Sequence, residues 1–314
     1  MIRWVGKQDW LQMGYFKRVW ILLYPWLVYE AVSTVVMMAY GFVIMLTDPE
    51  MIASAGNLFS FSEKLLEKIY GNYIPVSVAA CAVTIPLMIL FMRMDRKTEF
   101  RMNMKAEIWE KPEIRSFAWP FLCGVSACVV LNHVLIYSGL YELLQEGYEG
   151  TAEILFGGSF WLELLAVGIL TPVTEELIFR GLLYRRLRWS TDARFAIPAS
   201  AFIFAVFHGN LLQGIYAFCI GILLAFLYER YHHLAAPVLV HVGANIISVV
   251  LTDGKVLDFL YEADRESDFI IFTVGMMLVF VAAFYIILTR IRPERKDMPA
   301  PAPDTQEGGT TYGA

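Results

Sequence analysis

Long apolar stretches separated by short polar segments dominate the chain. Several of these stretches run for about 20 residues, the length that a helix needs to cross the hydrocarbon core of a bilayer. A transmembrane β-barrel would instead show short segments in which apolar and polar residues alternate. The pattern therefore predicts an all-α fold, a polytopic transmembrane bundle of about eight helices. Their expected bounds are 19–46, 73–92, 117–140, 160–184, 195–209, 211–230, 234–252 and 269–289.

Two of the intervening segments carry structural predictions of their own. The fifth and sixth expected spans are joined by little more than Gly209 and Asn210. We expect these spans to form a tight hairpin with its turn buried in protein, where irregular backbone is tolerated at membrane depth. Residues 47–72 are too polar to cross the membrane, and their FSFSEKLLEKIY stretch is predicted to form an amphipathic helix on the outer surface.

Charged residues alternate in sign from one loop to the next. Lysine and arginine accumulate at the N-terminus and after the second, fourth and eighth expected spans, whereas residues 141–159 and 253–268 are mainly acidic. Because basic loops stay on the cytoplasmic side, both termini are predicted to be cytoplasmic. An even number of spans requires the same arrangement.

Composition agrees with a membrane protein and gives no support for thiolate-bound metals or nucleic acid as partners. Hydrophobic residues make up 58% of the 314 positions and charged residues 18%, whereas a soluble domain is about half apolar and a quarter charged. The four cysteines lie in apolar stretches without a CxxC pair, so neither disulfides nor thiolate metal sites are expected. No basic patch with interleaved aromatic residues points to nucleic acid. We expect an integral, multi-pass protein of a prokaryotic plasma membrane.

Several polar side chains occur within the apolar stretches, where a charge costs about 2.5–3.5 kcal/mol on insertion scales. Counting 1.5 Å per residue from the expected cytoplasmic ends, Glu175 and His208 lie about 15 Å deep and His241 about 12 Å deep. Three helices thus bring polar groups to one level near the middle of the bilayer. The full set of candidate site residues is Glu175, Glu176, Arg180, His208, His241 and Asn245.

Helical spacing suggests separate roles for these residues. Glu176 and Arg180 are four residues apart and are predicted to form a neutralised structural pair. Glu175 lies about 100° around the helix from Glu176, which leaves its carboxylate free to act as a general base or acid. His241 and Asn245 share a helix face, and both can donate hydrogen bonds to a developing oxyanion. Together with His208, the set outlines the hydrolysis of an amide bond.

Two other interpretations of the same residues remain open. Glu175, His208 and His241 match the two-histidine, one-glutamate set of a catalytic zinc site, so a divalent metal such as zinc is an alternative to direct activation of water. Each polar residue could also serve as a hydrogen bond between helices, although that role does not explain why all of them lie at one depth. Neither HExxH nor GxSxG is present, which excludes soluble zincin and serine hydrolase interpretations.

The three segments resemble the CPBP family of intramembrane proteases, which includes the CaaX prenyl endopeptidase and bacteriocin-processing and self-immunity proteins. The family pattern EExxxR, FxxxH and HxxxN appears here as Glu175 to Arg180, Phe204 to His208 and His241 to Asn245. The resemblance covers about 160–250. It implies a peptidase in which Glu175 and His208 activate water while His241 and Asn245 stabilise the oxyanion, with metal involvement left open.

The resemblance also implies a substrate class and a domain organisation. We expect an endopeptidase that cuts a membrane-associated protein or peptide, lipidated or near its C-terminus. The alternatives are a non-proteolytic self-immunity or regulatory scaffold and a proton-coupled transporter, the latter disfavoured by the absence of an internal repeat. The expected regions are an interfacial segment at 1–18, three spans within 19–140, a CPBP-like catalytic core at 155–252, a last span at 269–292 and a disordered tail at 293–314.

Overall fold

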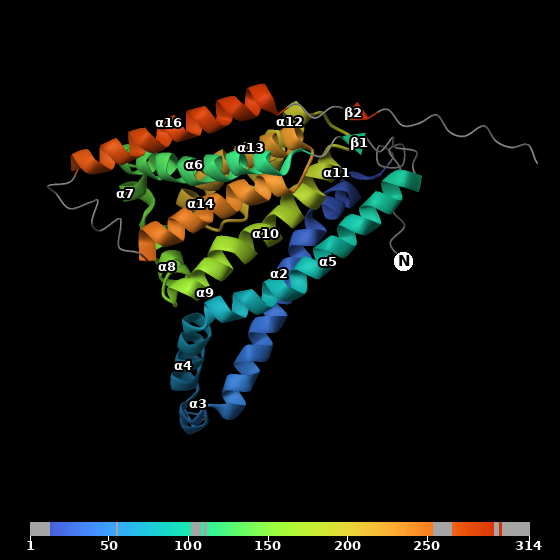
Figure 1. Ribbon diagram of the computed structural model, residues 1–314. Coiled ribbons are helices and arrows are strands. Elements are labelled where there is room, and N and C mark those ends of the chain that lie inside the picture. Colours follow the sequence, from blue (N-terminus) through green and yellow to red (C-terminus); the bar gives the residue numbers. More distant parts are fainter. Residues whose placement is uncertain are drawn as a thin grey trace, which may run out of the picture.

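The computed structural model describes residues 13–54, 56–101, 108–109, 112–253, 266–291 and 295–296. Within these ranges the chain is an assembly of packed helices (Figure 1), which confirms the predicted all-α bundle. The one pair of strands described, β1 (Ile108–Trp109) and β2 (Arg295–Lys296), is antiparallel and two residues long. Residues 1–12 of the predicted interfacial segment at 1–18 lie outside the described residues, and residues 15–18 begin the first long helix. The predicted tail at 293–314 lies outside them except for residues 295–296.

Among the described residues, six helices are long and apolar enough to cross a membrane. They are α2 (Tyr15–Thr47), α5 (Tyr73–Arg101), α6 (Ala118–Tyr137), α13 (Leu211–Tyr231), α14 (Ala235–Asp253) and α16 (Glu266–Arg290). A seventh span is broken: α8 (Glu146–Leu155) meets a long helix over residues 160–187 at an angle of 106°. That helix consists of α9 (Phe160–Leu165), the π-helical η2 (Ala166–Leu170), α10 (Thr171–Glu176), the π-helical η3 (Leu177–Tyr184) and α11 (Arg185–Leu187).

About eight spans were expected, and the described residues contain six long apolar helices, or seven if the bent pair forms one span. The stretch predicted as a span at 195–209 is α12 (Ala193–Val206), which has only 14 residues. At 1.5 Å per residue it is about 21 Å long, shorter than the bilayer core of about 30 Å. It packs against α13 as one arm of a hairpin, so the predicted tight hairpin is present although its first arm does not span.

Short helices cap the ends of the bundle. The predicted amphipathic helix is confirmed as α4 (Leu58–Gly71), which begins at the N-cap Asn57 and buries none of its side chains. With α3 (Pro49–Ser54) it joins the lower ends of α2 and α5 (Figure 1). The remaining short elements are the 3₁₀ turn η1 (Ile114–Phe117) and α7 (Leu140–Leu144).

The helix ends that adjoin basic loops lie on one side of the bundle, where polar contacts join them. The buried Arg186 binds Asp95 of α5 at 2.8 Å and the carbonyl of Ile21 in α2 at 2.6 Å. On the same side, the Tyr231 hydroxyl of α13 donates to the Ser116 carbonyl. The acidic α7 and α8 lie at the opposite end, at the left in Figure 1. The fold thus agrees with the alternation of charge, and the positive-inside rule assigns the basic end to the cytoplasm.

The backbones of α6 and α14 approach each other closely where glycines remove a side chain. A Cβ atom added to Gly124 would lie 1.9 Å from the Val240 carbonyl oxygen, and one added to Gly243 would lie 2.6 Å from the Phe121 carbonyl oxygen. Small residues allow such contacts between helices in membranes, where close packing drives association. This contact fixes α14 immediately before His241.

Replacing Gly124 with alanine is expected to lower the free energy of unfolding by about 1–3 kcal/mol, because an overpacked backbone contact must open. Thermal unfolding of the purified protein in detergent measures the effect. The matched control is Gly275→Ala in α16, where an added Cβ meets nothing within 4 Å. Equal melting temperatures for the two variants would contradict the close approach of α6 and α14.

Candidate active site

The long helix over residues 160–187 changes from α-helical to π-helical hydrogen bonding before its two glutamates. The Thr171 amide donates to the Ala166 carbonyl, five residues back, which shifts the helix into π register. In that register the donor for the Val167 carbonyl would be Pro172, which has no N–H. The Asn245 amide of α14 supplies the missing hydrogen bond at 2.9 Å. α14 is therefore attached to the long helix about two turns before the glutamates.

Glu176 is the buried centre of the cluster. Its Oε1 accepts hydrogen bonds from Arg180 Nη1 at 2.8 Å and from His241 Nδ1 at 2.9 Å. Arg180 Nη2 also donates to the Gly221 carbonyl of α13 at 3.1 Å. The side chains of Glu176 and Arg180 are both completely buried. The ion pair expected from their spacing is present, and it links α10, α13 and α14.

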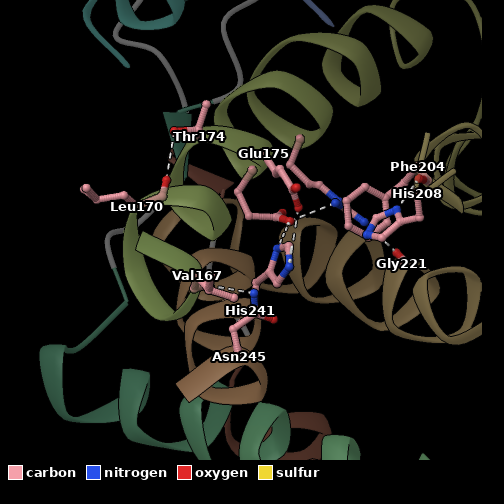
Figure 2. Close-up of polar contacts among 11 residues, drawn as sticks. Val167, Leu170, Thr174, Glu175, Phe204, His208, Gly221, His241 and Asn245 are labelled. Carbon is pink, nitrogen blue, oxygen red and sulfur yellow. Dashed lines mark hydrogen bonds and ion pairs between the residues drawn. The ribbon is translucent and has the colours of Figure 1, made fainter. Parts of the chain in front are cut away.

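His241 contacts both of the adjacent carboxylates, and Figure 2 shows its ring beside Glu175. A carboxylate accepts hydrogen bonds, so the contact with Glu176 puts the hydrogen of the imidazole on Nδ1. His241 Nε2 faces Glu175 Oε2 at 3.6 Å, slightly beyond hydrogen-bond distance. The exposed fraction of the side chain is 20% for Glu175 and zero for Glu176. Of the two carboxylates, Glu175 is thus the one within reach of a solvent molecule.

His208 lies in the turn between α12 and α13. α12 ends at Val206, Gly209 has a φ of 76°, and the Asn210 side chain caps α13. His208 Nδ1 is 2.8 Å from the Phe204 carbonyl, which only accepts, so the hydrogen of the neutral ring lies on Nδ1. The lone pair of Nε2 is then available to accept a hydrogen bond from water or to bind a metal.

Phe204 packs against both imidazoles and the arginine of the cluster. Its ring makes edge-to-face contacts with His208 and His241, with ring centroids 4.6 Å and 5.7 Å apart. The Arg180 guanidinium lies over the same ring at 4.6 Å from its centroid. Phe204, which the sequence pattern includes only as a motif position, therefore fixes the separation of the two imidazoles.

The residues proposed for a metal do not form a three-ligand set in this arrangement. Among the residues that the structure describes, no group of three or more His, Cys, Asp and Glu side chains could hold an ion. His241 Nδ1 is bonded to Glu176, its Nε2 faces Glu175 at 3.6 Å, and both imidazoles pack against Phe204. The zinc expectation for Glu175, His208 and His241 does not fit this geometry, and we derive no step through a metal.

The structure adds contacts that the sequence analysis missed. Asn245 was expected to face the reacting atom, but one of its amide hydrogens is used by the Val167 carbonyl. Its role as an oxyanion donor therefore stays a prediction that depends on the second hydrogen. Pro172 was the available signal, because a proline within a helix leaves a carbonyl without its donor. Outside the cluster, His133 of α6 contacts the Thr273 hydroxyl of α16 at 2.9 Å, in agreement with a packing role.

The site coincides with the part of the chain that matches a known family. Residues 157–247, which contain all of the site residues above, match the family described as Type II CAAX prenyl endopeptidase Rce1-like. We call residues 157–247 the CPBP region, because this match agrees with the resemblance of its three motifs to the CPBP family. A Bacillus subtilis (strain 168) protein named "Putative membrane peptidase YdiL" is 28% identical to the chain over 110 residues.

The likeness is limited to the CPBP region. The alignment with the Bacillus protein covers 35% of this chain and 45% of that relative, less than half the length of either. No solved structure matches the chain. The helices α2, α5, α6 and α16 lie outside the CPBP region, so what they add to the site must be judged from their own contacts.

Proposed function

We propose that the protein is an intramembrane endopeptidase that hydrolyses a peptide bond by means of water activated at Glu175. One observation carries the proposal: two adjacent carboxylates have opposite environments. Glu176 is completely buried and bonded to Arg180 and His241, whereas Glu175 is partly exposed and faces the second nitrogen of the same imidazole. A carboxylate that accepts a proton beside an oriented histidine is the arrangement that general-base catalysis requires.

Charge balance supports a proton shared by Glu175 and His241. With Arg180 positive, both carboxylates ionised and His241 neutral, the buried cluster would carry one net negative charge. Leaving a net charge in an apolar interior is costly. One additional proton on the Glu175–His241 pair makes the cluster neutral. The pair can thus both accept a proton and donate one.

The proposed reaction uses that proton, held on His241, together with a second proton taken from the attacking water. Glu175 and the Nε2 lone pair of His208 orient a water, and Glu175 takes its proton as the oxygen attacks the carbonyl carbon. The doubly protonated His241 donates from Nε2 to the oxyanion, assisted by the second amide hydrogen of Asn245. The proton held by Glu175 then passes to the leaving amine as the C–N bond breaks. Water supplies the hydroxyl and hydrogen of the two products, so the atoms balance.

The substrate belongs to the membrane. The cluster lies on spans within the bundle, and the family description names a prenyl endopeptidase while the Bacillus relative is named a membrane peptidase. We therefore propose a membrane-associated protein or peptide, lipidated or cut near its C-terminus, as the substrate. A prokaryotic plasma membrane is the proposed location, in keeping with the bacterial relative.

The test is a cleavage assay in liposomes with a library of fluorescence-quenched peptides, with and without a C-terminal farnesyl group. Wild type is expected to cut a subset that Glu175→Gln does not cut, whereas Glu142→Gln, which changes an exposed carboxylate of α7, cuts like wild type. Equal cleavage by wild type and Glu175→Gln would overturn the assigned role. Parallel reactions with a zinc chelator address the metal: cleavage that is lost and then restored by added zinc would contradict direct activation of water.

A further inference from the structure

The first span reaches the catalytic turn from outside the CPBP region. The indole of Trp26 in α2 is stacked face to face on the ring of Phe207, with centroids 3.9 Å apart and planes 14° apart. Phe207 immediately precedes His208, and its ring also contacts Phe179 of η3 at 6.0 Å. The residue next to the catalytic histidine is therefore held between α2 and the helix that carries the glutamates.

The chain leaves the α12 helix at this turn. Phe207 and His208 follow the end of α12, with their amides still bonded to the Ile203 and Ala205 carbonyls, and Gly209 at positive φ then reverses the chain. The imidazole is oriented by the Phe204 carbonyl and by the Phe204 ring. A displacement of the Phe207 side chain would rotate the adjacent His208 out of this position.

The depth of Trp26 argues against a role as an interfacial anchor. Tryptophans that anchor helices lie at the membrane–water interface. Ile21 marks that level in α2, because its carbonyl binds Arg186 at the cytoplasmic end, and Trp20 beside it is 51% exposed. Trp26 lies five residues further in, about 7.5 Å deeper, and is half-buried.

A second residue of α2 faces the other half of the site. Tyr29 follows Trp26 by three positions and so lies on the same helix face. It is close enough to Glu175 for the two groups to interact electrostatically. One face of α2 thus meets both the water-activating carboxylate and the turn that carries His208.

We propose that Trp26 is a positioning residue that holds His208 in its reactive orientation through Phe207, which makes span α2 part of the active site. The inference rests on the proposed function, since it concerns the step in which His208 orients water. Trp26→Ala is expected to lower kcat by about 10–100-fold, the effect of misplacing a catalytic group by about 1 Å. KM should stay within about twofold, because Trp26 does not touch substrate.

The experiment pairs the liposome cleavage assay with a readout that needs no substrate. Full-length variants in liposomes are treated with diethyl pyrocarbonate, and the labelling rates of His208 and of the distant His133 are compared by mass spectrometry. Trp26→Ala is expected to change the labelling of His208 several-fold and to leave His133 unaffected. Trp26→Phe, which keeps a ring for stacking, should restore both kcat and labelling. Trp20→Ala, on the exposed side of the same helix, should match wild type.

The two proposals fail in different ways. Unchanged kcat in Trp26→Ala overturns the positioning role, whatever the labelling. If wild type cuts no peptide, the peptidase proposal fails and the labelling rates decide the positioning role. Altered labelling of His208 in Trp26→Ala, but not in the control variants, upholds that role. Equal labelling in all variants overturns it. Loss of kcat in Trp26→Phe as large as in Trp26→Ala would also overturn it, since stacking would then not be the cause.

Discussion

An Arg180→Met variant is expected to lose about 3–5 kcal/mol of unfolding free energy, the cost of leaving a buried charge without its partner. Glu176 would lose the cation at 2.8 Å while remaining completely buried, and the Gly221 carbonyl would lose its donor. The Phe204 ring would also lose the guanidinium that lies over it. Titration of the purified protein with sodium dodecyl sulfate in mixed micelles measures the change.

A second substitution separates stability from activity. The double variant Glu176→Leu/Arg180→Met removes both charges and replaces them with apolar side chains of similar size, an exchange that is often neutral or stabilising. We expect it to recover most of the unfolding free energy that the single variant loses. Cleavage should nevertheless stay absent, because His241 Nδ1 no longer has the acceptor that orients the ring. A double variant as unstable as Arg180→Met would contradict this account of the pair.

Glu175→Gln and His241→Gln are each expected to lower kcat by about 10²–10⁴-fold, the range over which a positioned acid or base contributes. Both variants should stay folded. Glu175 is partly exposed, and a glutamine amide at position 241 can still donate to Glu176. Steady-state cleavage in liposomes measures the effect, and the melting temperature reports that the fold is intact.

The combination of these two substitutions tests whether the residues act as one unit. If Glu175 and His241 share the working proton, removing either one disables the pair, and the double variant Glu175→Gln/His241→Gln should be about as slow as either single variant. Residues that act together show such non-additivity. Independent roles would instead multiply the two losses, and that result would falsify the shared proton.

Sequence was most informative where chemistry follows local spacing. Glu176 and Arg180 are one helical turn apart, so their ion pair could be predicted from spacing. The hairpin at Gly209 could be predicted because almost no residues are left for a loop. The bond between Glu176 and His241 joins residues 65 positions apart, and its register depends on the packing of α10 against α14. The attachment of Asn245 to Val167 required a π-helical break that no periodicity reveals. The segment at 195–209 was predicted at nearly its observed length of 14 residues, but its apolar pattern did not reveal that so short a helix is one arm of a hairpin and not a span.

The shortness of α12 has a consequence for the surrounding bilayer. Phe195, Phe202 and Val206 form an exposed apolar face of this helix, about 21 Å long beside a hydrocarbon core of about 30 Å. Negative hydrophobic mismatch of this kind is relieved when neighbouring lipids thin and their chains tilt. The acyl layer is therefore shallowest beside the turn that carries His208. A polar peptide segment that approaches from the lipid beside α12 therefore crosses a thinner hydrocarbon layer than one that approaches beside the full-length spans.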